Sequence, residues 1–285
     1  MTQALLLSET HNAGKSVGPW LATWLTCDRA LMLVGLGFLL LLLPSGVAAW
    51  FDTRTLAGVG VWAKPMKFQF AVGTLLMTLA WFMPYASHAF RHGRARNWLV
   101  AAAIATALFE VGYITLQGAL GQASHFNESD ALHRSLYHLM GLGALTLSLC
   151  GGWLGLEIWR NPASGLPRVL HWSIALGLML SCVLGVASGL TISIMGGPLV
   201  GEASASAPRL WLFGWSLGGG DLRVAHFIGV HAMQVLPALA WLWCRGGPGR
   251  DARSATRDGV AAVLLATAWL LFWSGSYALA LLQFS

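Results

Sequence analysis

Residues 218–237 read Gly-Gly-Gly-Asp-Leu-Arg-Val-Ala-His-Phe-Ile-Gly-Val-His-Ala-Met-Gln-Val-Leu-Pro, an apolar run with polar side chains inside it. The three glycines end a loop, and Asp221 is placed to cap a helix. The helix would then carry four polar residues, Arg223, His226, His231 and Gln234. Polar side chains at membrane depth are costly and usually face a protein interior or a water-filled cavity. The stretch therefore predicts a membrane bundle built around an interior polar site.

The composition of the whole chain supports a membrane protein. Of its 285 residues 56% are hydrophobic and only 10% are charged, whereas globular domains carry about 25% charged residues. Apolar runs of 18 or more residues recur, as in proteins with several membrane-spanning helices. The net charge of +6 resides in short loops and not in a basic helix or an aromatic patch, so we expect no nucleic-acid partner. The four cysteines lack metal-like spacing, and we interpret them as small apolar residues.

Hydrophobic patterning predicts an all-α fold, an integral membrane bundle of seven transmembrane helices. The expected spans are 29–50, 66–86, 97–120, 133–159, 168–194, 222–244 and 258–282. Residues 1–28 are expected to form a cytoplasmic or interfacial segment containing Trp20 and Trp24, and residues 29–285 a single transmembrane domain. Seven spans place the two termini on opposite sides.

Loop charge predicts the orientation. Eleven of the 17 Lys and Arg residues fall on the side of the N-terminus: Lys15, Arg29, Arg91, Arg94, Arg96, Arg160, Arg168, Arg245, Arg250, Arg253 and Arg257. The richer side is expected to be cytoplasmic, with the N-terminus inside and the C-terminus outside. The longer loops then lie outside, so we expect function at the outer face.

Glu110 is the acidic residue placed deepest in a predicted span. It shares one helical stripe with Thr106, Tyr113 and Gln117. A charge at the membrane centre costs roughly 2.5 to 3.5 kcal/mol on insertion scales. Glu110 is therefore expected either to be hydrogen-bonded to a neighbouring helix or to carry protons or contact a substrate.

Spans four and six repeat a short pattern. Each has an Arg near its outer end, a His about one turn deeper and a Gly three residues further. In span four the His and Gly are His138 and Gly141. In span six the three residues are Arg223, His226 and Gly229. At 1.5 Å per residue, both imidazoles lie within roughly 10 Å of the outer helix ends. The pattern predicts that His138 and His226 bind haem b between them, or a transition-metal ion completed by His125 or Glu110.

A competing interpretation makes these histidines interhelical hydrogen-bonding residues. The pairs His133/His138 and His226/His231 are spaced i, i+5, which separates the two side chains by about 140° on a regular helix. Neither pair chelates one ion from a single helix, so any site must be assembled from different helices. Polar contacts between membrane helices need no cofactor.

The remaining polar residues of span six are predicted to surround that site. Gln234 projects between His226 and His231, and we assign Glu110, His231 and Gln234 to proton handling. Arg223, Lys64 and Lys67 would form a basic rim that attracts an anionic substrate, a haem propionate or a lipid phosphate. For the two lysines, snorkelling to lipid headgroups is the favoured interpretation.

Three stretches resemble those of bacterial multi-span inner-membrane proteins: Trp62-Ala-Lys-Pro-Met-Lys-Phe68, Ser124-His-Phe-Asn127 and Asp221-Leu-Arg-Val-Ala-His-Phe-Ile-Gly-Val-His-Ala-Met-Gln234. The resemblance covers roughly residues 60 to 240 and supplies no activity, cofactor or catalytic residue. It implies a bacterial inner membrane whose outer face is the periplasm. A retinal protein is excluded because residues 258–282 contain no lysine for a Schiff base.

The leading hypothesis from the sequence is a periplasm-facing redox or metal protein with His138 and His226 as ligands. The first alternative is a proton-coupled small-molecule transporter or channel that uses Glu110 and the histidines. The second is a non-catalytic sensor or assembly partner that uses the third outer loop, residues 195–221. In span five, Gly177, Ser181, Gly185 and Gly189 are predicted to form a packing seam against another helix.

Overall fold

The computed structural model of this chain describes residues 26–127, 129–161, 163–201, 207–210, 213–246 and 252–282. It is nearly all helical, with 78% helix and 3% strand, which confirms the all-α part of the predicted fold class. The predicted interfacial segment that contains Trp20 and Trp24 lies outside the described residues.

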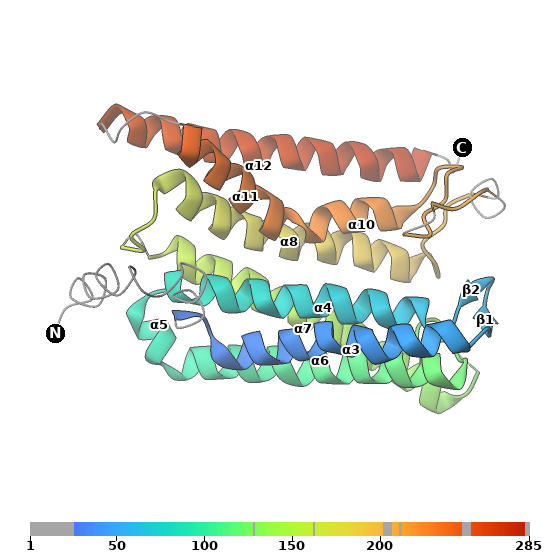
Figure 1. The fold of residues 1–285 in the computed structure, drawn as a ribbon. Coiled ribbons are helices and arrows are strands. Elements are labelled where there is room, and N and C mark those ends of the chain that lie inside the picture. The colour runs from blue at the N-terminus through green and yellow to red at the C-terminus, as the bar shows by residue number, and fades with distance from the viewer. Residues whose placement is uncertain are drawn as a thin grey trace.

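The helices follow the predicted spans closely. They are α3 (Arg29–Phe51), α4 (Ala63–Phe82), η1 (Met83–Tyr85), α5 (His88–His92), α6 (Arg94–Leu120), α7 (Ala131–Trp159), α8 (Arg168–Ile194), α10 (Leu222–Val230), α11 (Ala232–Gly246) and α12 (Ala252–Leu281). Two short strands, β1 (Thr55–Leu56) and β2 (Val59–Gly60), pair antiparallel after α3. We call the end of the bundle that carries these strands the hairpin end, and the opposite end the α5 end (Figure 1).

Local sequence fixes the ends of the first long helix. The Asp28 carboxylate accepts a hydrogen bond from the backbone N–H of Leu31 at 3.2 Å and so caps α3. No charged residue follows Arg29 until Asp52, where the helix ends. The chain then reverses through Ala57 and Gly58, both at positive φ, into the β1–β2 hairpin.

Among the described residues, six helices are long and apolar enough to cross a membrane, and the bent pair α10–α11 makes a seventh if it counts as one span. Many large apolar side chains on these helices face outwards, among them Leu43 at 69% and Ile194 at 84% exposed. Such a surface suits lipid and not water. The chain is therefore a multi-pass membrane protein. Its first described helix starts at the α5 end and α12 ends at the hairpin end (Figure 1), as an odd number of crossings requires.

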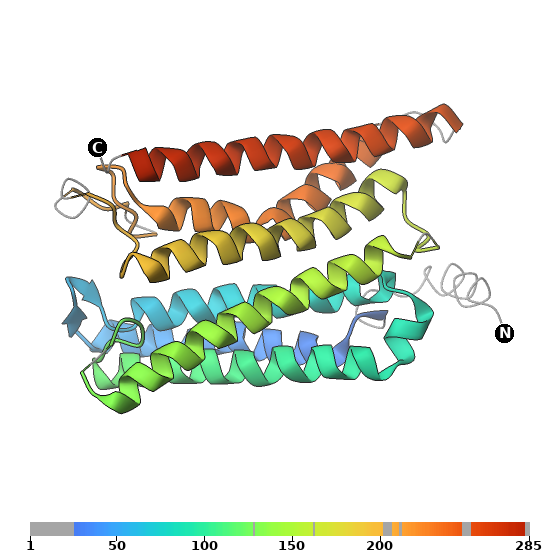
Figure 2. The same cartoon turned by 180° about the vertical axis from the view of Figure 1, so that it is seen from behind.

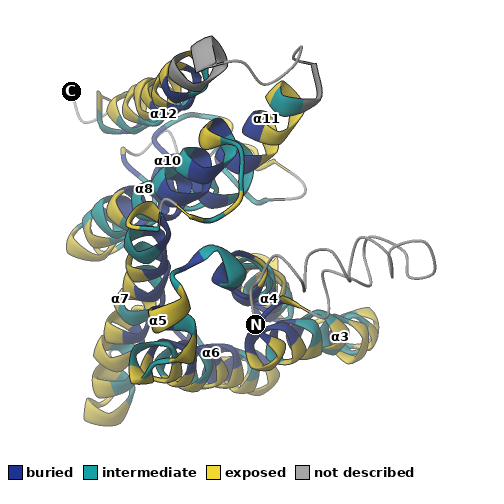
Figure 3. Ribbon diagram, turned by 90° about the vertical axis from the view of Figure 1, so that its left-hand side faces the viewer, coloured by how far each residue is buried: buried dark blue, intermediate teal, exposed yellow. Residues whose placement is uncertain are grey.

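The helices form two groups. The first comprises α3, α4, α6 and α7, and the second comprises α8, α10, α11 and α12 (Figures 1 and 2). Helices α7 and α8 pack along each other and join the groups. Figure 3 shows the bundle from the α5 end. Helix α7 lies next to α8, whereas α4 lies on the other side of the first group and is separate from α8 and α11.

The predicted packing seam of α8 is confirmed. A methyl group added at Gly177 would stand 2.8 Å from the carbonyl oxygen of Ala232 in α11, and one added at Gly185 would stand 2.9 Å from Val230 of α10. Small residues here let the backbones of α10 and α11 approach α8 closely.

The predicted span 222–244 is present as a bent pair of helices and not as one regular helix. The segment bends by 52° between α10 and α11. In a regular helix the N–H of Met233 would donate to a backbone carbonyl, but here it donates to Ser181 Oγ at 2.9 Å. The Ser181 hydroxyl in turn donates to the carbonyl of Val230 at 2.9 Å. One hydroxyl of α8 therefore replaces two backbone bonds and stabilises the break.

Candidate functional site

The polar stripe of α6 lies inside the first helix group. Glu110, Tyr113 and Gln117 are 3%, 9% and 4% exposed. The stripe faces α7 at Gly143, where an added methyl group would stand 2.5 Å from Glu110 Oε1 and 3.1 Å from Thr106 Cγ2. The prediction that these residues share one face is confirmed, and the absence of a side chain at Gly143 leaves room for the carboxylate.

Lys64 and His125 complete this group at the hairpin end. Lys64, in the first turn of α4, interacts electrostatically with both Glu110 and His125. Its ammonium group lies 5.9 Å from the ring centre of Phe68, whose ring is 5.7 Å from that of His125. Lys64 is half-buried and has an acid within electrostatic range, and the favoured interpretation that it snorkels to lipid headgroups stays a prediction.

His125 lies in the loop between α6 and α7, outside the membrane spans. Burial, and to a smaller extent the positive charge of Lys64, lower the pKa of this imidazole to about 3. His125 is thus neutral at ordinary pH. A neutral imidazole can donate one hydrogen bond and accept one, so it can contact a ligand without adding a second positive charge beside Lys64.

We call Lys64, Glu110, Tyr113, Gln117 and His125 the hairpin-end cluster. Three of its buried polar atoms have no hydrogen-bond partner among the described residues: Glu110 Oε1, the Tyr113 hydroxyl and Gln117 Oε1. A buried polar atom without a partner costs about 1 to 3 kcal/mol. Three such atoms on one helix face, beside a lysine and an imidazole, form a group that a polar ligand would stabilise.

The two predicted haem ligands occupy different surroundings. His138 is exposed on α7, with its ring centre 5.6 Å from that of Tyr137. His226 of α10 lies against α8, with Nδ1 at 3.0 Å from Ser188 Oγ and its ring beside Gly189. This contact is an interhelical hydrogen bond of the kind in the competing interpretation. The shared haem or metal site stays a prediction, and the structure adds no support to it.

The two glycines that follow those histidines in the repeated pattern, Gly141 and Gly229, also differ in their surroundings. A methyl group added at Gly141 would contact nothing within 4 Å. At Gly229 it would stand 3.0 Å from Leu184 Cβ and 3.1 Å from the indole nitrogen of Trp273. Gly229 therefore serves the packing of α10 against α8 and α12, and the short sequence repeat does not correspond to a repeated environment.

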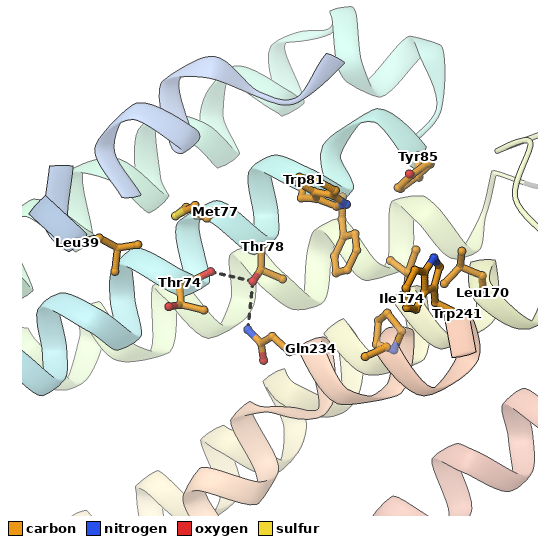
Figure 4. A pocket seen from close by; sticks show the side chains of 13 residues that line it. Leu39, Thr74, Met77, Thr78, Trp81, Tyr85, Leu170, Ile174, Gln234 and Trp241 are labelled. Carbon is orange, nitrogen blue, oxygen red and sulfur yellow. Dashed lines mark hydrogen bonds between the residues drawn. The ribbon is translucent and has the colours of Figure 1, made fainter. Parts of the chain in front are cut away.

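The break at His231 separates the polar residues of span six. His231 Nδ1 donates to the carbonyl of Phe227 at 2.7 Å, and the two rings stack at 3.9 Å. Gln234 lies beyond the break and reaches across to α4, where its amide nitrogen donates to Thr78 Oγ1 at 3.1 Å (Figure 4). His226, His231 and Gln234 are therefore engaged with three different partners.

The predicted basic rim exists only in part. The Arg223 guanidinium donates two hydrogen bonds to the Asp221 carboxylate, at 2.8 and 2.5 Å, and a third to the carbonyl of Gly214 at 2.9 Å. Lys67 donates to the carbonyl of Phe213 at 2.8 Å, which ties α4 to the loop before α10. Both cations hold the loop between α8 and α10, whereas Lys64 alone belongs to the hairpin-end cluster.

No group of three or more His, Cys, Asp or Glu side chains is placed to hold a metal ion within the described ranges of the chain. The same ranges contain four free cysteines, two of them buried, in line with their interpretation as small apolar residues.

The hydrogen bonds that two glutamines, Gln69 and Gln234, make between helices were not predicted from the sequence. Gln69 of α4 donates to Ser45 Oγ at 2.8 Å and to Thr115 Oγ1 at 3.2 Å, so one amide joins α3, α4 and α6. The bond between Gln234 and Thr78 joins residues 156 positions apart. The sequence shows single polar residues within apolar spans, but it does not indicate which spans face each other.

No family model, no curated protein and no solved structure matches this chain.

Proposed function

We propose that this protein is a proton-coupled transporter of small polar solutes in a bacterial inner membrane, with seven spans, the N-terminus in the cytoplasm and the C-terminus in the periplasm. The excess of Lys and Arg at the α5 end supports this orientation. In this orientation the hairpin-end cluster lies on the periplasmic side of the bundle, and we take it as the solute-binding site.

One observation carries the proposal. Glu110 is buried in the bundle, its Oε1 has no hydrogen-bond partner among the described residues, and Lys64 interacts with it electrostatically. Most buried polar side-chain atoms have at least one hydrogen-bond partner. Glu110 instead keeps one oxygen available for a proton or for a donor group of a solute.

The composition of the cluster indicates the solute. Lys64 favours an anionic group, because an ammonium and a carboxylate form a strong charge-assisted hydrogen bond. Glu110 Oε1 and Gln117 Oε1 are acceptors that need a donor. A small amino acid or hydroxy acid carries both kinds of group. Glu110 would bind and release a proton as the solute arrives and leaves.

The test is uptake into proteoliposomes that contain the full chain. We expect a labelled member of a panel of amino acids and hydroxy acids to accumulate when the outside is made acidic. Glu110→Gln should abolish the dependence on the pH gradient, and Lys64→Met should weaken binding of the solute. Absence of uptake of every panel member by the native chain would contradict the proposal.

Haem or metal binding ranks second. The two proposed ligands lie in different surroundings. His138 is exposed on α7, and His226 is hydrogen-bonded to Ser188 of α8. The test is an absorption spectrum with metal analysis of the purified protein. A Soret band or a stoichiometric metal would favour this proposal over transport.

A further inference from the structure

A cavity of about 600 Å³ lies between the two helix groups, apart from the hairpin-end cluster. Helix α4 and η1 form one wall with Thr78, Trp81 and Tyr85, and α11 forms the other with Gln234 and Trp241 (Figure 4). The volume falls within the range of about 300 to 1,000 Å³ that is usual for small-molecule sites.

The position of the cavity decides how a ligand enters. Its lining on α4 and η1 runs from Thr74 to Tyr85, roughly 16 Å at 1.5 Å per residue. On α8 it includes Leu170 and Ile174, both in the first two turns of that helix. The cavity therefore extends from mid-membrane to the α5 end. Because helices long enough to span the bilayer form its walls, we take the lipid as the route by which a molecule reaches it.

The deep part of the cavity is polar. Gln234 donates one amide hydrogen to Thr78 Oγ1 at 3.1 Å, and the Thr78 hydroxyl donates to the carbonyl of Thr74 at 2.7 Å. Gln234 Oε1 has no hydrogen-bond partner among the described residues. An amide offers two donors and one acceptor, so this side chain has unused capacity for bonding. A lipid acyl chain in the cavity would leave these amide groups without hydrogen-bond partners, which costs free energy.

The shallow part of the cavity is aromatic. Trp81 and Trp241 lie on opposite walls and are 44% and 45% exposed, and Tyr85 lies near the α5 end (Figure 4). Aromatic side chains favour flat ring systems through stacked and edge-to-face contacts. The cavity thus combines an amide at its deep end with aromatic walls.

We propose that this cavity binds a lipid-soluble ring compound of the quinone class, which enters from the bilayer and places a ring carbonyl against Gln234. The carbonyl accepts the second amide hydrogen of Gln234, the one that Thr78 Oγ1 does not use. The ring lies between the walls that carry Trp81 and Trp241, and the apolar tail extends towards the lipid.

The experiment is photolabelling of the full chain in lipid nanodiscs with a decyl-tailed benzoquinone that carries a diazirine beside the ring. Mass spectrometry should find the label on peptides that contain residues 74–85 and 234–241. Excess decylbenzoquinone should prevent this labelling, and decylbenzene, which has the same tail and no carbonyl, should not. Labelling elsewhere, or equal competition by decylbenzene, would overturn the proposal.

Variants of α11 sharpen the result. Gln234→Leu removes the amide at similar size and should reduce competed labelling roughly tenfold, which corresponds to the loss of one hydrogen bond. The matched control is Leu239→Ala, an exposed position of α11 outside the cavity lining, which should label as the native chain does. Unchanged labelling of folded Gln234→Leu protein would refute the role of the amide.

A second variant covers the case in which Gln234→Leu fails to fold. Ala238→Trp places a large side chain in the lining from an exposed position and keeps the bond between Gln234 and Thr78. This variant should also prevent labelling. Full labelling of Ala238→Trp would contradict the proposal that the ring compound binds in this cavity. Glu110→Gln should label normally, which separates this proposal from that of the hairpin-end cluster.

Discussion

The carboxylate of Glu110 in α6 lies against the bare backbone of Gly143 in α7, so close that an added methyl group would stand 2.5 Å from Oε1. The two residues are 33 positions apart, and the sequence alone did not indicate that they meet. Their contact defines where the acid sits and which substitution would displace it.

Gly143→Ala should therefore disturb the hairpin-end cluster without unfolding the protein. The atom that the methyl group meets is the end of a flexible side chain, which can move, and the movement takes the carboxylate out of place. Misplacement of a working group by about 1 Å can cost 100-fold in rate, so we expect solute uptake to fall roughly 10- to 100-fold. Gly141→Ala is the matched control on the same helix, since its methyl group would meet nothing, and its uptake should stay native. Equal uptake by both variants would show that the position of Glu110 is unimportant.

Ser181→Ala should destabilise the bent span. The substitution removes the hydroxyl that bonds the N–H of Met233 and the carbonyl of Val230 at the break. Leaving these backbone groups unpaired should cost about 1 to 3 kcal/mol and lower the thermal midpoint of unfolding in detergent. Ser274→Ala serves as the control, because Ser274 is exposed and its hydroxyl bonds only within α12. If both variants unfold at the native temperature, the hydroxyl does not stabilise the break.

His125 should make stability depend on pH. Its pKa is about 3 in the folded protein, against 6.5 for the free side chain, because burial disfavours the charged form. Between these values the unfolded state binds more protons, so stability falls as the pH is lowered from about 6.5 towards 3. Melting of the native chain and of His125→Gln should be compared across this range. The native chain should lose more stability than the variant on acidification, and parallel curves would show that His125 is not buried as described.

His138→Ala should have little effect on stability, within about 0.5 kcal/mol, because the side chain is exposed on α7. His226→Ala should cost about 1 to 2 kcal/mol, because it removes the hydrogen bond to Ser188 in α8. Thermal unfolding of both variants checks this difference. A visible absorption band that His138→Ala abolishes would instead support the haem interpretation.

The sequence predicted the helices well and the site in part. Apolar runs located every span to within a few residues, and the four-residue spacing from Gly177 to Gly189 correctly indicated close packing of α8. The stripe from Thr106 to Gln117 was also read correctly, since helical periodicity alone places its residues on one face. These features depend on local geometry, which a single sequence contains.

Contacts between helices were less accessible. The patterns around His138 and His226 match in sequence, yet the first side chain faces outwards and the second faces α8. The bend after Val230 depends on Ser181, which belongs to another helix. The sequence of residues 222–244 alone therefore could not predict it. The partnership of Lys64 with Glu110 likewise depends on how α4 meets α6. Helix rotation and pairing decide these contacts, and in an apolar chain the hydrophobic pattern constrains them weakly.

The most direct test of the central claim is whether solute and proton move together through Glu110. Proteoliposomes of the full chain, loaded with a pH-sensitive dye, should acidify inside when the transported amino acid or hydroxy acid is added outside. Glu110→Gln proteoliposomes should still bind that solute and should show no acidification. Equal acidification by the native chain and by Glu110→Gln would contradict the assignment of Glu110 as the proton-carrying group.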